Sequence, residues 1–161
     1  DLSPVSHWGF TWKDFYAKMP YDYDVIQLAI INPAQVYMQL HKRFVNDFST
    51  ACYIITRHHA QKLVNLHCRG DKYKLDQGVL PRAVADDLIY NSGNTFSIPL
   101  FLYKIELGSS IHDIHVNVFH KSSYEGLWQF WRADSQNIED WNPMFSYDPY
   151  FHRIPPGFEG K

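Results

Sequence analysis

Residues 20–31 read PYDYDVIQLAII, and this stretch decides the fold. From Tyr23 to Ile31 it is short, apolar and rich in β-branched side chains, which predicts a strand covered on both faces of a sheet. Ser49–Thr56 (STACYIIT) has the same character and predicts a second buried strand. We expect the apolar parts of these two stretches, Val25–Leu28 and Cys52–Ile55, to be neighbours in one sheet.

Amphipathic segments alternate with these strands along the chain. Ser3-Pro4 forms a helix-start signal, and an apolar face then recurs at i, i+4, i+7 and i+11 over Trp8–Met19. Thr56 is a candidate N-cap for a helix over His58–His67. Ala83–Tyr90 predicts a short helix that a turn rich in Asn and Gly stops.

The remaining segments complete the expected architecture. Thr95–Glu106 predicts a strand or a pair of strands, because Pro99 forces an edge or a bulge. Strands that alternate with helices indicate an α/β fold with a mainly parallel central sheet flanked by helices. Residues 135–161 are rich in proline and aromatic rings and have little periodicity. We therefore expect an irregular C-terminal tail that packs on a single domain of residues 1–134.

The composition excludes several classes of protein. A formal net charge of −2 with no basic run argues against a nucleic-acid partner. No apolar stretch approaches the roughly 20 residues that a membrane span needs. Aromatic residues make up 17% of the 161 positions, which suits either a core rich in rings or a carbohydrate site. The core is the commoner use of such rings.

Cysteines and the first residues bear on the compartment. Cys52 and Cys68 show no CxxC motif and no framework, so we expect free thiols in a reducing compartment. The first ten residues have neither the basic nor the apolar region of a signal peptide, which favours a cytoplasmic location. No initiator methionine precedes Asp1, so we expect the chain to be part of a longer product. Nothing here indicates an oligomeric state.

Asp86 and Asp87 are adjacent carboxylates at the head of the short helix. One interpretation is a charged first turn that the helix dipole favours. The other is catalytic: one carboxylate accepts a hydrogen bond from a sugar hydroxyl near a sheet end, where ligands of α/β proteins bind. We expect the pair at the rim of a cleft, with at least one carboxylate accepting a backbone or ligand hydrogen bond.

Three histidines lie within nine residues, at His112, His115 and His120. Neutral imidazole nitrogens are ligands for divalent metals, but this spacing matches neither HExxH nor a zinc finger. In an extended segment His112 and His115 would point to opposite faces, so at most one would meet a given metal. The alternative is a set of hydrogen-bonding histidines at a strand end.

Trp128 and Trp131 stand in a third constellation, the run LWQFWR. Their rings are candidates to stack on the C–H face of a sugar and so to bind substrate. A tryptophan pair at i and i+3 is more often part of a core.

Two of the segments above resemble strands of the family 25 glycosyltransferases and their viral relatives. Pro20–Leu28 resembles the P-x-D-W-D-I-I-x-L strand of that family. Ser49–Thr56 is similar to its S-T-x-A-Y-I-I strand, and Ala60–Leu63 to the G-A-x-K-L helix that follows. The order of the segments along the chain is the same as in the family.

Three later segments continue this resemblance. Ala85–Tyr90 looks like the acidic acceptor motif of the family. Phe96–Tyr103 and Ser109–His112 resemble its P-x-F strand and its closing S-x-I-H element. The matches extend from Asp1 to Tyr124, and the tail after Trp131 matches no motif.

The resemblance implies a GT-A fold, a UDP-sugar donor and a Mn²⁺ ion, or another divalent metal, that bridges the diphosphate. In that family an acidic motif and a late histidine hold the metal. Asp1 stands where the last carboxylate of the motif would be, and His112 or His115 stands for the late histidine. By the same carry-over Asp86 or Asp87 is at the sugar. The rest of the nucleotide-binding half would precede Asp1.

The predicted function is a hexosyltransferase that transfers a sugar from a UDP-sugar to a glycan or glycoprotein acceptor. Two alternatives stay open. One is a non-catalytic GT-A remnant that binds a glycan or another partner. The other is a metal-dependent hydrolase that uses His112, Asp113, His115 and His120.

Overall fold

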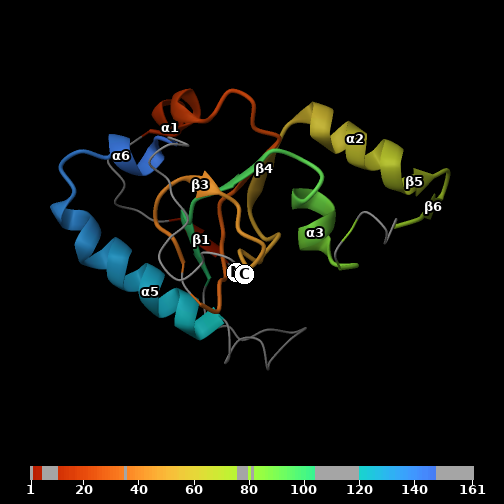
Figure 1. The fold of residues 1–161 in the computed structure, drawn as a ribbon. Coiled ribbons are helices and arrows are strands. Elements are labelled where there is room, and N and C mark those ends of the chain that lie inside the picture. The colour runs from red at the N-terminus through yellow and green to blue at the C-terminus, as the bar shows by residue number, and fades with distance from the viewer. Residues whose placement is uncertain are drawn as a thin grey trace.

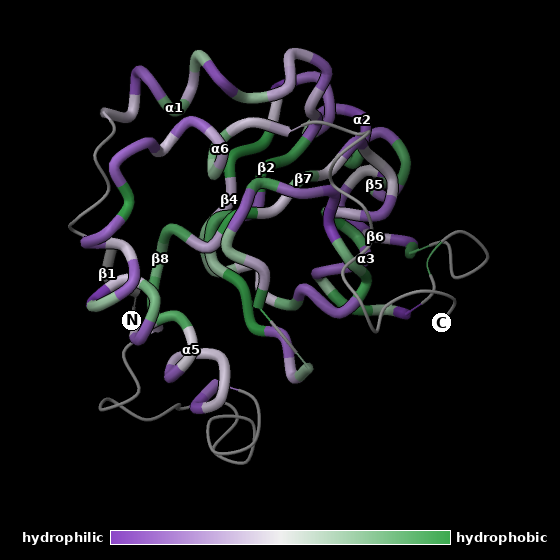
Figure 2. Tube along the Cα trace, turned by 60° about the vertical axis from the view of Figure 1, so that its left-hand side comes forward, coloured by the Kyte–Doolittle hydropathy of each residue, from purple (hydrophilic) through white to green (hydrophobic). Residues whose placement is uncertain are grey.

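The computed structural model describes residues 2–4, 11–34, 36–75, 80, 82–103 and 120–147. These residues form a mixed α/β structure whose centre is a four-stranded sheet with the order β3-β7-β2-β4. In Figure 1, α1, α5 and α6 lie on one side of this sheet, and α2 and α3 lie on the other. Figure 2 shows hydrophobic stretches along β2 in the interior and mainly hydrophilic ones on the outlying α1.

The stretch that decides the fold supplies the central strand β2, Val25–Gln27, whose three residues are buried. It pairs antiparallel with β4, Tyr53–Ile55, so the expected adjacency of the two apolar stretches is confirmed. The strand β4 is only half-buried because it lies at the edge of the sheet, and the expectation that it is fully covered was wrong.

The sheet is mixed, and the prediction of a mainly parallel sheet was wrong. Only β7, Thr95–Ser97, runs parallel to β2. The two edge strands, β4 and β3 (His41–Lys42), are antiparallel to their neighbours. The strand β3 comes from the segment between β2 and β4, for which we predicted no element.

The first helix begins later than its sequence signal. Helix α1 spans Trp12–Lys18, and Thr11 caps it in a capping box with Asp14. Ser3 and Pro4 belong instead to β1, Leu2–Pro4, so the helix start predicted there was wrong. The strand β1 pairs antiparallel with β8, Phe101–Tyr103, in a separate two-stranded sheet.

Helices α2 and α3 follow their sequence signals closely. Helix α2 spans Arg57–His67, with the Thr56 hydroxyl accepting a hydrogen bond from the amide of His59, as its predicted role requires. The strands β5 (Cys68–Arg69) and β6 (Lys72–Tyr73) form a hairpin after it. Gly70 in that hairpin has a φ of 66°, a conformation that favours glycine. Helix α3 spans Ala85–Tyr90.

The C-terminal part is more regular than expected. Helix α5 spans Lys121–Arg132, and the short η3 (Asp134–Asn137) and α6 (Asn142–Phe145) follow it. Trp131 stacks on Trp141 with ring centroids 5.8 Å apart and planes 6° apart. The irregular tail predicted from residue 135 was therefore wrong as far as Phe145, because aromatic packing orders this segment against the core.

Two further sequence expectations concern thiols and membranes. Cys52 and Cys68 are both free, as expected. Among the helices that the structure describes, none combines the length and the apolar character that crossing a membrane requires.

Gly93 and Gly126 provide a matched test of this packing. A Cβ on Gly93 would lie 2.6 Å from Cε1 of His59 and 2.8 Å from Cβ of Asp24, whereas a Cβ on Gly126 in α5 meets nothing within 4 Å. We expect Gly93→Ala to lower the free energy of unfolding by about 1–3 kcal/mol through overpacking. Gly126→Ala should raise it by about 1 kcal/mol, because alanine favours a helix interior. Urea unfolding measures both, and a Gly93→Ala variant as stable as the wild type would contradict the close approach of this turn to α2.

Candidate functional site

The two acidic residues of α3 have different surroundings. Asp87 is buried, and its carboxylate forms a bidentate ion pair with Arg82, at 3.0 Å to Nε and 2.7 Å to Nη2. The hydrogen bond from Arg82 is the main cause that holds the pKa of Asp87 below its ordinary value. Because Asp87 is fully buried and pairs with Arg82 through both oxygens, its carboxylate is not exposed to a sugar hydroxyl.

Asp86 faces a different neighbour and is half-buried. Its Oδ1 accepts a hydrogen bond of 2.5 Å from the backbone amide of Ser49. The expectation that one carboxylate of the pair accepts a backbone hydrogen bond is thus confirmed. A carboxylate has about four lone-pair sites, so Asp86 keeps acceptor capacity for a further donor. None of the described cavities is lined by either residue.

Ser49 joins Asp86 to two tyrosines, and we call these four residues the Ser49 cluster. The hydroxyl of Tyr90 donates to the Ser49 carbonyl at 2.7 Å. The hydroxyl groups of Ser49 and Tyr103 share a hydrogen bond. Burial raises the pKa of Tyr103 to about 12 and also raises that of Tyr90, so both hydroxyls keep their protons at neutral pH.

The backbone of Ser49 is strained. Its φ is 105°, which makes it the one non-glycine residue with positive φ in the described part of the chain. A conformation of this kind costs on the order of 1–3 kcal/mol and persists only where the surroundings hold it. Strained backbone gathers at ligand and catalytic sites, so this angle marks the position for functional study.

The Ser49 cluster lies at one end of the strands of the central sheet. Ser49 precedes β4, and the first residue of β4, Tyr53, is paired with Gln27, the last residue of β2. Since β2 and β7 are parallel, the carboxyl ends of both strands lie on this side of the sheet. In open α/β sheets, ligands bind outside the carboxyl ends of parallel strands.

A buried polar network supports the loop before Ser49. Asp47 is fully buried and accepts hydrogen bonds of 3.0 Å from Nε2 of His41, from Nδ2 of Asn32 and from the amide of Phe44. Arg43 donates to the Asp47 carbonyl at 3.1 Å and lies over the ring of Tyr90. Sequence analysis missed this network, because its members come from a segment without periodicity and no motif joins them.

His120 is the member of the histidine group that the structure describes. It immediately precedes α5, and its ring packs edge-on against Tyr103 with centroids 5.0 Å apart. The described residues on both sides of segment 104–119 therefore meet at the Ser49 cluster. His112 and His115 lie in that segment, outside the described residues, as does Asp1. No group of three or more His, Cys, Asp or Glu that could hold a metal occurs among the residues described.

The two tryptophans of α5 have separate roles. Trp131 is 3% exposed, and its indole N–H donates to the carbonyl of Pro99 at 3.1 Å. The structure thus assigns Trp131 to the core, the commoner of the two interpretations. Trp128 is 42% exposed and lines a groove of about 570 Å³. Of the two residues predicted to bind substrate, only Trp128 presents its ring at the surface.

No family model, curated protein or solved structure matches this chain. The family resemblance that rests on the motifs therefore stays a prediction.

The ion pair between the buried Asp87 and the partly exposed Arg82 predicts a pH dependence of stability. A lowered pKa in the folded state adds stability above the unfolded value of about 3.9, and this stability is lost as the pH falls through the folded value. Asp87→Asn should lower the free energy of unfolding by about 1–3 kcal/mol at pH 7, because the ion pair is lost. The loss is limited because solvent screens the partly exposed Arg82. The difference from the wild type should shrink below about pH 4. Urea unfolding from pH 3 to 7 measures this, with the exposed Asp71→Asn as the control, and a deficit that does not change with pH would contradict the ion pair.

Proposed function

We propose that this chain is the acceptor-side part of a hexosyltransferase that transfers a sugar from a UDP-sugar to a glycan or glycoprotein. The observation that carries the proposal is the placement of Asp86 beside the strained Ser49 at the carboxyl ends of β2 and β7. Asp86 is one of the two residues, with Asp87, that the acidic acceptor motif of the resembling family would place at the sugar. The resemblance supports a GT-A fold for the whole enzyme, and the mixed α/β sheet is compatible with it.

Asp86 would orient the acceptor. One lone pair of its carboxylate holds the Ser49 amide, and a second would accept a hydrogen bond from the attacking sugar hydroxyl. A positioned carboxylate of this kind can take up the proton that the hydroxyl loses during transfer. Ser49 and the two tyrosines would keep the carboxylate in one orientation, which is the condition for a reactive geometry.

The donor side of the proposal involves residues outside the described part of the chain. Asp1 and His112, with His115 as the second choice, are the proposed ligands for Mn²⁺. The ion would neutralise the charge that develops on the UDP leaving group. Among the described residues, Tyr103 and His120, which flank the segment with His112 and His115 in the sequence, pack on each other, and Tyr103 belongs to the Ser49 cluster.

A glycan-binding module without turnover is the second candidate. It is favoured by the exposed Trp128, which lines a groove with polar side chains.

Asp86→Asn tests the role of the carboxylate. The amide oxygen of asparagine can still accept from Ser49, so the fold should persist, whereas proton acceptance is lost. We expect the rate of sugar transfer from a UDP-hexose in the full-length protein to fall by about 10²-fold or more. The release of UDP measures this rate. The exposed Asp71→Asn is the matched control and should keep the wild-type rate. Transfer at the wild-type rate by the folded Asp86→Asn variant would reduce Asp86 to a partner of the loop backbone.

Calorimetric titration of UDP in the presence of Mn²⁺ tests the metal ligands. His112→Ala should weaken Mn²⁺-dependent UDP binding, and His115→Ala is the second variant, whereas His58→Ala on the exposed face of α2 should not. An imidazole must be neutral to bind a metal, so affinity should fall as the pH drops through about 6.5. If both variants of the 104–119 segment, made in the full-length protein that includes the upstream half, bind UDP and Mn²⁺ like the wild type, the proposed metal site is wrong.

A further inference from the structure

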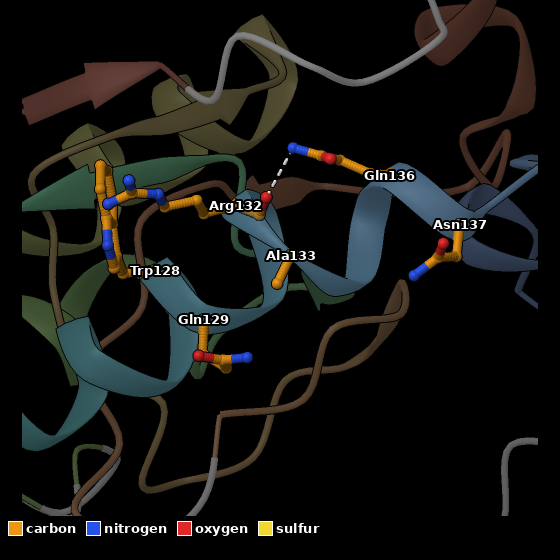
Figure 3. A pocket seen from close by; sticks show the side chains of 6 residues that line it. All are labelled: Trp128, Gln129, Arg132, Ala133, Gln136 and Asn137. Atoms are coloured by element: carbon orange, nitrogen blue, oxygen red, sulfur yellow. Dashed lines mark hydrogen bonds between the residues drawn. The ribbon is translucent and has the colours of Figure 1, made fainter.

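A polar groove runs along the end of α5 and into η3. Its volume is about 570 Å³, within the roughly 300–1,000 Å³ typical of small-molecule sites. Six residues line it, and Figure 3 shows them: Trp128, Gln129, Arg132, Ala133, Gln136 and Asn137.

The exposed ring of Trp128 is held by neighbours on its own helix. Tyr124, one turn earlier, stacks on it with planes 14° apart and centroids 5.8 Å apart. Arg132, one turn later, lies over the same ring with its guanidinium carbon 5.4 Å from the centroid. Figure 3 shows the side chains of Trp128 and Arg132 next to each other. This stack of three side chains presents an indole and a cation together at one end of the groove.

The backbone of the groove is anchored to the core. Leu127 and Trp131 on the opposite face of α5 are buried. The hydroxyl of Ser135 donates to the Trp131 carbonyl at 2.6 Å, and the side-chain Nε2 of Gln136 donates to the Arg132 carbonyl at 2.7 Å. These bonds fix η3 against the end of α5, so the lining groups are positioned before any ligand arrives.

The lining chemistry selects a class of ligand. Three side-chain amides can donate to and accept from hydroxyl groups, and the exposed part of the Trp128 indole, between Tyr124 and Arg132, can contact the apolar face of a sugar ring. Arg132 offers a planar fork for a carboxylate. None of the described residues that line the groove is acidic, and none of the salt bridges in the described part of the chain involves Arg132.

We propose that this groove is a saccharide subsite that accepts an acidic sugar, with Trp128 and Arg132 as its main contacts. The inference rests on the carbohydrate substrate of the proposed function and adds the charge of the acceptor. Arg132 binds the carboxylate of the sugar, and the amides of Gln129, Gln136 and Asn137 bind its hydroxyls.

Methyl glucuronide and methyl glucoside form a matched pair of probes, since they differ in a carboxylate against a hydroxymethyl group. Each is titrated into the ¹⁵N-labelled chain without UDP or metal, and the indole N–H signal of Trp128 is followed by NMR. We expect a saturable shift with the glucuronide and a dissociation constant about tenfold lower than for the glucoside. Added salt should reduce this preference, because the pair is exposed to solvent.

Substitutions separate the two contacts. Arg132→Gln should remove the preference for the glucuronide and leave glucoside binding unchanged. Trp128→Ala, followed on the backbone amide signals of Gln129 and Asn137 because its indole is gone, should weaken binding of both probes. Arg57→Gln and Trp12→Ala change an exposed arginine and an exposed tryptophan elsewhere, and should leave both affinities as they are. The control variants, read on the Trp128 signal, show that the effect belongs to the groove.

Three outcomes would overturn the inference. They are the absence of a saturable shift at Trp128 with either probe, equal affinities for the two probes, and a preference that survives Arg132→Gln. The test is independent of turnover. Glucuronide binding at Trp128 in a protein without transferase activity would support the subsite and contradict the hexosyltransferase, whereas transfer to neutral acceptors with no Trp128 shift would do the reverse.

Discussion

The side-chain amide of Gln27 is the contact on which the candidate site depends. It interrupts the apolar run of the central strand and is fully buried. The two hydrogens of its nitrogen are shared among the carbonyls of Asp47, Phe48 and Ser49 at 2.9–3.2 Å, and its oxygen accepts from Ser97 on β7 at 2.8 Å. A buried amide without these partners would cost about 1–3 kcal/mol, so the central strand and the loop must form together.

This constraint explains how a serine keeps a positive φ. The carbonyl of Ser49 accepts from Gln27 and from Tyr90, while its amide donates to Asp86. The peptide groups on both sides of Ser49 are therefore fixed by groups from β2 and α3. On the far side of the loop, Asp47 is held by buried partners of its own. These bonds hold the strained angle, in which the Ser49 amide donates to the carboxylate of Asp86.

The sequence predicts this fold where the determining interactions are local. Thr56 caps α2 through a contact three residues away, and the apolar runs of β2 and β4 identify themselves by composition. Pro4 shows the limit: the same residue suits a helix start or an edge strand, and pairing with β8, far along the chain, decides for the strand. The Ser49 cluster joins residues 37 to 54 positions apart, and no local pattern specifies such contacts. The sequence identifies the Asp86–Asp87 pair as a candidate site. It does not show that Asp86 contacts the loop while Asp87 pairs with Arg82.

The two proposed subsites are connected by one rigid element. His120 at the head of α5 packs on Tyr103 of the Ser49 cluster, and Trp128 follows eight residues later. At 1.5 Å per residue the helix places Trp128 about 12 Å from His120 along its axis. Leu127 and Trp131 lock α5 to the core, so this separation is fixed. In an acceptor longer than one sugar, an acidic sugar unit would bind in the groove while a second sugar unit approaches Asp86. The binding energy gained in the groove would then help to orient the reacting hydroxyl.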